Sequence, residues 1–190
     1  MGGQKEKEMT RVPIPDRDDA PPESQEMLNA VARQLRFVPA LFRAASISPE
    51  ALTGLTQLSG AMSRAFDART LARIALAVSQ VNECKYCLSL HTYLGMNFGK
   101  PSPDEMLRNR WGDSTDAKST ALVMFVRKLV ETRGKVVDSE LQMIRDAGFD
   151  DAQIIEIVAA SAYFIFMNLI NNVFDTKVDF PEVDIDSKAA

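Results

Sequence analysis

The sequence contains few of the residues that cross-link small proteins or bind metals. Of its 190 residues, 2 are cysteine, 1 is histidine and 1 is tryptophan. The cysteines, Cys84 and Cys87, lie three positions apart, so they cannot form the disulfide framework of a small secreted protein. A chain of this length can bury a stable core without such cross-links. Metal binding and redox chemistry are therefore the specialised uses left for this close cysteine pair.

The sequence also lacks a concentration of positive charge. Its net charge is −4, and residues 1–26 carry 4 basic and 7 acidic side chains, while residues 175–190 carry 2 and 5. The segment between them carries 16 basic and 14 acidic side chains and is close to neutral. Basic residues are not interleaved with aromatic ones, as they are on a nucleic-acid-binding surface. We therefore predict no nucleic-acid partner.

A long uninterrupted hydrophobic run is missing as well. The most apolar stretch, residues 154–174, contains one glutamate and three asparagines, which a bilayer span tolerates poorly. This stretch therefore predicts a buried helix and no membrane association. Residues 1–8 lack the apolar core of a signal peptide, and no glycine-rich nucleotide fingerprint is present. We therefore predict a cytoplasmic protein without a bound cofactor.

What the sequence does contain is a succession of helix-start signals. Serine, aspartate or asparagine residues that can cap a helix stand before apolar segments of helical periodicity. Alternating strand patterns are weak by comparison, so we predict an all-α fold. Residues 74–78 are apolar on every face of their helix and are expected in the core. The predicted helix starts are Ser24, Ser48, Asp67, Asn82, Ser102, Asp116, Asp138 and Asp150, with capping boxes at Ser102–Glu105 and Asp150–Gln153.

Prolines and charges divide the sequence into three parts. Residues 1–23 contain four prolines among charged residues and predict an extended N-terminal arm. Residues 24–176 are predicted to form one helical domain, and residues 177–190 an acidic C-terminal tail.

Both cysteines and the single histidine fall between Cys84 and His91. On a helix, the spacings of three and four place Cys84, Cys87 and His91 on one face. Residues three apart in a helical turn lie about 5 Å apart, within the range of a disulfide. We expect Cys84 near the second helical residue, where unpaired amides and the helix dipole favour an anion. His91 is expected one turn beyond Cys87, where it can exchange a proton with that thiol directly or through water.

The free energies involved show why the histidine matters. A thiol with a pKa of about 8.5 is only about 3% thiolate at pH 7, and lowering the pKa to 7 takes about 2 kcal/mol. A helix start supplies about 0.3–1 kcal/mol, so an imidazole that accepts the proton is a natural second source. We favour a redox-active dithiol. Two alternatives stay open: a pair of buried cysteines without chemistry, and a zinc ion held by Cys84, Cys87, His91 and water.

The order of these residues resembles a known superfamily. The segment Ile74 to Asn82, followed by Cys84-x-x-Cys87-x-x-x-His91, is similar to alkyl hydroperoxidase D-like (AhpD-like) proteins, also called the carboxymuconolactone decarboxylase superfamily. The likeness covers roughly residues 27–183. It implies an AhpD-like helical bundle that forms homo-oligomers, as dimers, trimers or hexamers.

The resemblance also implies a role for each site residue. In the peroxidase branch the second cysteine attacks the hydroperoxide and the first forms the disulfide. Cys87 is then peroxidatic, Cys84 resolving and His91 a proton relay, although the helix-start argument alone favours Cys84 as the attacking thiol. The family pattern has a glutamate twelve residues before the first cysteine, where this chain has Ala72. We therefore expect a slower relay or an acid from elsewhere.

Together these inferences predict a thiol-dependent antioxidant oxidoreductase with peroxiredoxin activity. Its partners would be a small-molecule hydroperoxide and an external dithiol reductant. One alternative is thiol–disulfide exchange with a protein or lipoyl partner, with little peroxidase activity. Another is a non-catalytic oligomer that responds to the redox state of the pair.

Overall fold

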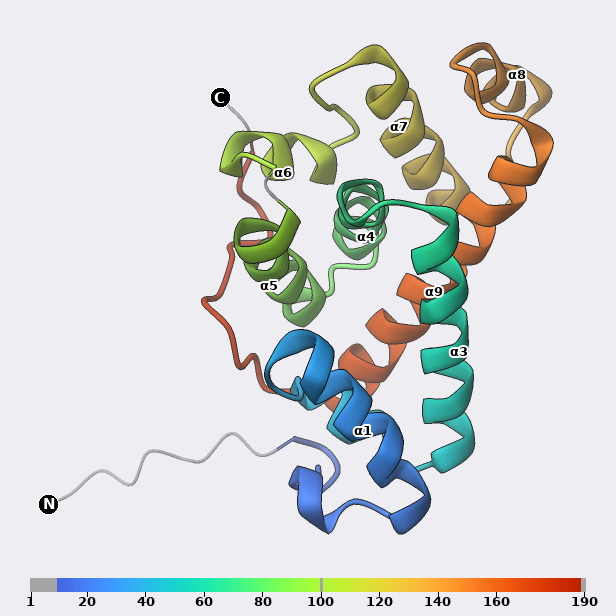
Figure 1. Ribbon diagram of the computed structural model, residues 1–190. Coiled ribbons are helices and arrows are strands. Elements are labelled where there is room, and N and C mark those ends of the chain that lie inside the picture. The colour runs from blue at the N-terminus through green and yellow to red at the C-terminus, as the bar shows by residue number, and fades with distance from the viewer. Residues whose placement is uncertain (1–9, 100, 189–190) are drawn as a thin grey trace, which may run out of the picture.

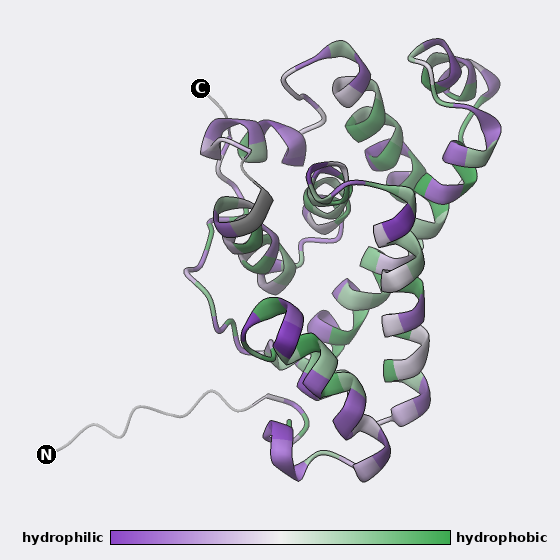
Figure 2. Ribbon diagram, in the orientation of Figure 1, coloured by the Kyte–Doolittle hydropathy of each residue, from purple (hydrophilic) through white to green (hydrophobic). Residues whose placement is uncertain are grey.

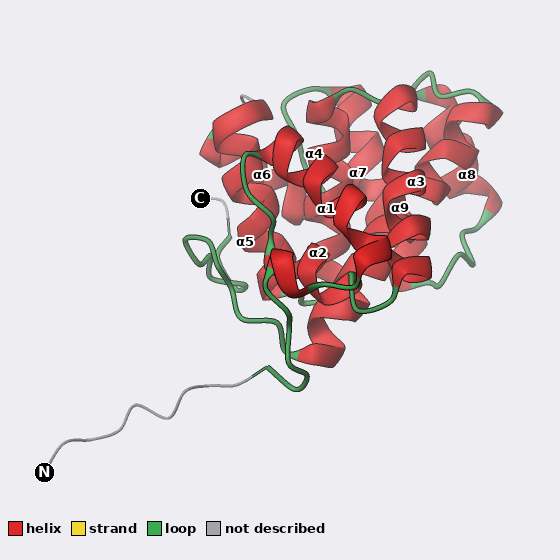
Figure 3. Ribbon diagram, turned by 60° about the horizontal axis from the view of Figure 1, so that its bottom comes forward, coloured by secondary structure: helices red, strands yellow, loops and turns green. Residues whose placement is uncertain are grey.

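The computed structural model describes residues 10–99 and 101–188 (Figure 1). Helices and loops account for all of these residues, and no strand occurs among them, so the predicted all-α fold is confirmed (Figure 3). The helices are η1 (Arg17–Asp19), α1 (Pro22–Leu35), α2 (Ala40–Ala45), α3 (Pro49–Ala65), α4 (Ala68–Val81), α5 (Lys85–Leu94), η2 (Gly95–Gly99), α6 (Pro103–Arg110), α7 (Ala117–Glu131), α8 (Asp138–Asp146) and α9 (Asp151–Phe174).

Helix α4 lies at the centre of the bundle. It is seen end-on in the middle of Figure 1, and it packs against α5, α6, α7 and α9. Residues 74–78 are fully buried, as their apolar sequence predicted. Most of the surrounding helices carry both hydrophilic and hydrophobic residues, as Figure 2 shows, because each has one face on the core.

Five of the predicted helix starts are confirmed in detail. At each of them the side-chain oxygen accepts a hydrogen bond from the backbone amide three residues further on. A cap of this kind stabilises a helix by about 1 kcal/mol because it pairs an amide that the helix leaves free. These five caps are Ser48, Asp67, Ser102, Asp116 and Asp150.

One predicted start is wrong by a few residues, and another is confirmed as the first residue of its helix. Helix α1 begins at Pro22, where proline fits the first turn, and Ser24 lies inside the helix. The Ser24 hydroxyl is buried and donates to the carbonyl of Ser46 (2.9 Å), so it ties α1 to the end of α2. Asp138 is the first residue of α8, and the cap position before it is Val137.

The two chain ends run along the helical bundle. The amide of Arg11 donates to the carbonyl of Phe174 (2.9 Å), so the described part of the N-terminal arm lies beside the end of α9. After α9 the chain turns back past α5 towards α6, as the red segment of Figure 1 shows. The amide of Val183 donates to the Ser89 hydroxyl on α5 (3.2 Å). Residues 1–9 of the predicted arm lie outside the described residues.

Helix α9 is the one helix among the described residues that is long and apolar enough to cross a membrane, judged by length and composition. It packs against α2, α3, α4, α5 and α7 within the bundle. Of its most apolar window, 44% is buried inside the fold. These contacts are those of a core helix, as the interrupted sequence pattern predicted.

The predicted capping box at the start of α6 is only half formed, because Glu105 has another partner. Ser102 accepts the amide of Glu105, but the Glu105 carboxylate forms ion pairs with Arg69 and with Arg73 (2.8 Å) of α4. Burial alone would raise the pKa of Glu105, and the two guanidinium groups outweigh it, so this pKa lies below its usual value. The ion pairs therefore join α6 to the central helix.

Replacing Glu105 tests this connection. We expect Glu105→Ala to lower the free energy of unfolding by about 3 kcal/mol, because it leaves the buried Arg73 with only its longer contacts to Asp116 (3.7 Å) and Thr115 (3.4 Å). Chemical denaturation measures the change. Because the pKa of Glu105 is lowered in the folded state, its contribution is present above the ordinary glutamate pKa of about 4.3 and is lost as the pH falls through the lowered value.

The matched control is Asp104→Ala, which removes an exposed carboxylate from the same helix. Its contact with Arg108 is long (3.9 Å), so we expect a loss of less than about 1 kcal/mol. Equal losses in the two variants would contradict the role assigned to Glu105.

Candidate active site

The cysteine pair lies at the turn between the central helix α4 and helix α5. Helix α4 ends at Val81, and Glu83 adopts a left-handed backbone conformation (φ 51°) that reverses the chain. Cys84 then takes the capping position of α5 in extended conformation. The prediction that Asn82 caps this helix and that Cys84 is its second residue is therefore wrong. Asn82 instead ends α4, and its side-chain amide points to α9.

Cys84 caps α5 with its sulfur. The backbone amide of Cys87 donates to Cys84 Sγ (3.4 Å), in the way that a serine or aspartate side chain accepts at other helix starts. Both cysteines are free thiols, and neither has measurable exposed surface. The structure thus brings together the two cysteines that the sequence paired, and it shows them in the reduced state.

Helix α9 supplies a side-chain amide to the second cysteine. Asn171 Nδ2 donates to Cys87 Sγ (3.2 Å) and to the carbonyl of Met167 (3.0 Å). The second bond fixes the orientation of the amide, because a carbonyl only accepts. Among the described residues, Asn171 Oδ1 has no hydrogen-bond partner although it is buried. Keeping a buried polar group in this state is unfavourable, which indicates that the amide serves the thiol rather than the packing.

A second asparagine of α9 supports the turn before the cysteines. Asn168 Nδ2 donates to the hydroxyl of Ser79 (3.2 Å), and Asn168 Oδ1 accepts from Asn82 Nδ2 (2.9 Å). Sequence reasoning assigned no role to Asn168 or Asn171. The signal was present, because asparagines inside the most apolar stretch of the chain must find polar partners once that stretch is buried.

The two thiols differ in acidity. A hydrogen bond from the Cys87 thiol lowers the pKa of Cys84, assisted by the backbone amides of Cys87 and Tyr86 and opposed by burial. Burial raises the pKa of Cys87, and the neighbouring Cys84 raises it further. The first proton therefore leaves Cys84, in agreement with the helix-start argument. Hydrogen bonds from Asn168 and Asn171 act in the opposite direction on Cys87 and favour its thiolate.

His91 lies one turn after Cys87 and is buried. Burial lowers the pKa of His91 to about 4, so its ring is neutral at pH 7. Its ring packs edge-on against Phe164, with centroids 5.1 Å apart. Within the described part of the chain, His91 Nε2 has no hydrogen-bond partner. A neutral imidazole carries one donor and one acceptor nitrogen, so it can pass a proton on without storing it.

A cavity of about 670 Å³ opens beside His91. Side chains of α1, α3, α4, α5 and α9 line it, and none of the lining residues is Asp, Glu, Lys or Arg. Ala72 lies in its wall, so the position of the family glutamate is an apolar part of the cavity here. The polar side chains that line it are Gln34, Thr56, Ser59, Ser63, His91 and Tyr163.

Tyr163 is the second titratable group on the cavity wall. Burial raises its pKa to about 12, with a smaller opposing effect from a hydrogen bond with Ser59. The phenol therefore stays protonated and can donate a hydrogen bond into the cavity. Tyr163 also lies close enough to Cys87 to feel the charge of its thiolate. Cys87 is thus the cysteine whose charge acts on this phenol, although neither cysteine lines the cavity itself.

The zinc alternative finds no support in this geometry. Within residues 10–99 and 101–188, no group of three or more His, Cys, Asp and Glu side chains is arranged to hold a metal ion. Cys84 and Cys87 instead form hydrogen bonds with amides and with each other.

Comparisons with known proteins agree with this fold. Residues 49–128 match the sequence model of the carboxymuconolactone decarboxylase family. No match to the chain is found among curated protein sequences. Among solved structures, an uncharacterized peroxidase-related protein from Ralstonia eutropha JMP134, described as an alkylhydroperoxidase AhpD core, has a TM-score of 0.79 at 20% identity, over 90% of this chain and 93% of that chain.

Two further structures share the fold. An uncharacterized peroxidase-related protein from Silicibacter sp. TM1040 has a TM-score of 0.75 at 24% identity, over 93% of this chain and 95% of that chain. A debrominase in complex with 2,3,4-tribromopyrrole has a TM-score of 0.75 at 15% identity, over 93% of this chain and 94% of that chain.

The family match and the shared fold confirm the resemblance predicted from the sequence. The chain has the AhpD-like fold, and its segment 49–128, which contains Cys84, Cys87 and His91, matches the carboxymuconolactone decarboxylase family. Helix α9, with Asn168 and Asn171, lies outside the matched segment.

The role of Asn171 can be tested through the acidity of Cys87. In a Cys84→Ser background, where one thiol remains, we expect Asn171→Leu to raise the apparent pKa of Cys87. A hydrogen bond to a charged group contributes about 1.5–3 kcal/mol, so alkylation near neutral pH should slow by about tenfold or more. The pH dependence of the reaction with iodoacetamide measures both quantities.

Asn172→Leu is the control for this experiment. Asn172 neighbours Asn171 on α9 and donates to the carbonyl of Asn82 (3.0 Å), without contact to either sulfur. It should leave the Cys87 pKa unchanged. An unshifted pKa in Asn171→Leu would rule out the stabilisation of the thiolate by this amide.

Proposed function

We propose that the protein is a thiol-dependent oxidoreductase that reduces organic hydroperoxides by cycling Cys84 and Cys87 between dithiol and disulfide. The observation that carries the proposal is the pair itself. Two buried thiols share hydrogen bonds at a helix start, and Cys87 lies beside a cavity with His91 and Tyr163 in its wall. The AhpD-like fold and the peroxidase-related names of proteins that share it support the same class of chemistry.

The reaction begins at Cys87. Cys84 has the lower pKa and loses its proton first; the Cys87 proton then shifts along the hydrogen bond to Cys84 in a small fraction of the molecules, and this leaves the negative charge on Cys87. The Cys87 thiolate then attacks the terminal oxygen of the hydroperoxide, the O–O bond breaks, and Cys87 becomes a sulfenic acid. The leaving alkoxide takes a proton that the cavity wall passes on from solvent water, and it departs as an alcohol. His91 and Tyr163 are the side chains on that wall that can donate it.

The second cysteine completes the cycle. The sulfur of Cys84 attacks the sulfur of Cys87, the S–O bond breaks, and the hydroxyl leaves with the Cys84 proton as water. The product is the Cys84–Cys87 disulfide. An external dithiol reduces this disulfide through a mixed disulfide and is itself oxidised. Because thiols are re-reduced in the cytoplasm, we propose that location for the protein.

The loss of the family glutamate fits this scheme. Ala72 leaves the cavity wall uncharged, so no carboxylate is available there to take the proton of Cys87. In the proposed scheme Cys84 performs that step. His91, which is neutral because its pKa is lowered to about 4, then relays a proton to the leaving oxygen: one ring nitrogen donates while the other accepts a proton from solvent.

The alternative of thiol exchange with a protein partner finds less support. Both cysteines have no measurable exposed surface, so the disulfide of a folded protein cannot reach them without an opening of the fold. Neither cysteine lines the cavity, so a small molecule inside it also needs a local movement of the fold to reach Cys87, but a smaller one than a folded protein needs. The debrominase of the same fold is described with a bound halogenated pyrrole, which supports a small organic ligand in such a fold.

Variants of the three site residues test the cycle. With cumene hydroperoxide and dithiothreitol, we expect Cys87→Ser to abolish turnover. Cys84→Ser should stop after one turnover, which should also be slower because serine cannot take the proton of Cys87, and a sulfenic acid should remain on Cys87 that dimedone traps. His91→Ala should reduce kcat by about tenfold to a hundredfold, within the range of general acid catalysis. Full turnover by Cys87→Ser would contradict the proposed roles.

We also propose that the protein is a homo-oligomer. Helix α9 exposes apolar side chains at helical spacing: Ile155 (70% exposed), Val158 (43%), Phe166 (37%), Leu169 (56%) and Val173 (54%). From residue 157 to residue 174 the helix carries no charged side chain. A continuous uncharged stripe of this kind is typical of a surface covered by another subunit.

Light scattering tests this association. We expect the wild type to have a mass that is a multiple of 21.0 kDa, and Leu169→Glu to reduce it by placing a charge in the apolar contact. The control is Met143→Glu on α8, which changes an equally exposed methionine outside the stripe. A monomeric wild type, or an unchanged mass in Leu169→Glu, would contradict the proposal.

A further inference from the structure

The mouth of the cavity can be located from its exposed lining residues. Most of the lining is buried or half-buried, but Ala30, Gln34, Ser63 and Ala68 are exposed. They come from α1, from the end of α3 and from the start of α4. The cavity therefore opens to solvent between these three elements.

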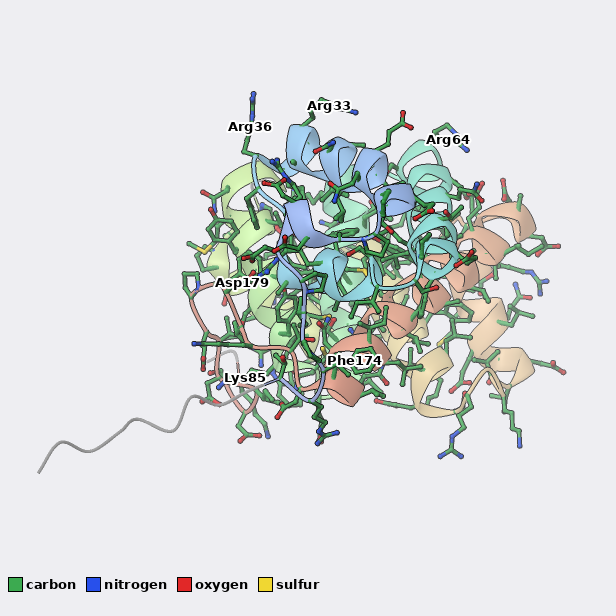
Figure 4. The ribbon with its side chains drawn as sticks, turned by 90° about the horizontal axis from the view of Figure 1, so that it is seen from below. Arg33, Arg36, Arg64, Lys85, Phe174 and Asp179 are labelled. Atoms are coloured by element: carbon green, nitrogen blue, oxygen red, sulfur yellow. The ribbon has the colours of Figure 1, made fainter. Side chains whose placement is uncertain are left out.

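Three exposed arginines lie on the helix ends that border this mouth, spread along one edge of the molecule (Figure 4). Arg33 and Arg36 are at the end of α1, and Arg64 is near the end of α3. Figure 4 shows all three extending outward from one edge of the molecule. Arg64 Nη1 donates to the carbonyl of Gly60 (2.9 Å), and Gly60 lines the cavity. The guanidinium group of Arg64 is thus bonded to the backbone of a cavity-lining residue, while its side chain stays exposed.

These arginines are not neutralised by neighbouring acids. None of the three forms an ion pair within the described part of the chain. Glu26 and Asp67 are the acidic residues nearest to them along the lining segments. The Asp67 carboxylate accepts the amide of Thr70 (2.7 Å), which lowers its pKa and commits it to capping α4.

We propose that the cavity binds an amphipathic organic anion of the fatty-acid type. Its apolar body would fill the uncharged interior, and its carboxylate would stay at the mouth beside Arg33, Arg36 and Arg64. A charge inside the cavity would have no partner, whereas arginine binds a carboxylate through two parallel hydrogen bonds. The inference deepens the proposed function, because a hydroperoxide of this class would then be the preferred substrate.

Binding can be measured without turnover. We compare a dansyl-labelled undecanoic acid with its methyl ester in the Cys87→Ser variant, by fluorescence titration at low ionic strength. The acid should bind at least tenfold more tightly than the ester, and added salt should reduce the difference, because the arginines are exposed. Unlabelled fatty acids should displace the probe about fourfold better per added methylene until the cavity is full.

Substitution of the arginines locates the head group. Arg33→Gln, Arg36→Gln and Arg64→Gln should each weaken binding of the acid severalfold and leave binding of the ester unchanged. The control is Arg133→Gln at the end of α7, because Arg133 is exposed and shares the left-handed backbone conformation of Arg36. Arg133→Gln should change neither affinity.

The outcomes separate this inference from the proposed function. Equal affinity for acid and ester, or no binding of either, would overturn the inference even if the wild type reduces the uncharged cumene hydroperoxide. Selective binding of the acid that depends on the three arginines would support the inference even if no hydroperoxide is turned over. The proposed peroxidase function would then fail, while the assignment of a fatty-acid-type ligand would be retained.

Discussion

The site depends on one hydrogen bond at the start of α5, between the Cys87 amide and the Cys84 sulfur. The helix begins on a cysteine, and the amide of Cys87 points at the sulfur of Cys84 rather than at an oxygen. A thiol accepts such a bond weakly and a thiolate accepts it strongly, so the bond that begins the helix also favours the ionised form of Cys84. Folding of α5 and activation of the pair are therefore the same physical event.

The start of α5 is buried between α4 and α9, and this burial opposes the formation of charged groups at the site. Removing water raises the pKa of Cys87 and lowers that of His91, which disfavours the charged form of each. Asn171 offsets part of this with a hydrogen bond to Cys87, and the apolar cavity beside His91 keeps the reacting end of a substrate away from bulk water. With Ala72 in the wall, the proposed cycle assigns proton transfer to the two thiols, His91 and Tyr163.

Much of the fold could be predicted because its signals are local. Ser48 and Asp67 are residues of types that cap helices, and each stands directly before an apolar segment of helical periodicity. The spacing of the cysteine motif likewise places its three residues close to one another in the sequence. The short helix α2 and the role of Asn171 could not be predicted in the same way. They depend on contacts between segments far apart in the chain, such as the 84 positions between Cys87 and Asn171. The same holds for Glu105. Its carboxylate was predicted to accept the backbone amide of Ser102, and it instead pairs with arginines of α4.

The central claim is that Cys84 and Cys87 form a redox pair that a hydroperoxide oxidises. The most direct measurement treats the fully reduced protein with one equivalent of cumene hydroperoxide, then counts free thiols and maps the product by mass spectrometry. The account predicts the loss of both thiols and a disulfide between Cys84 and Cys87 within one chain. Two thiols that survive this treatment, or oxidation that stops at independent sulfinic acids, would contradict it.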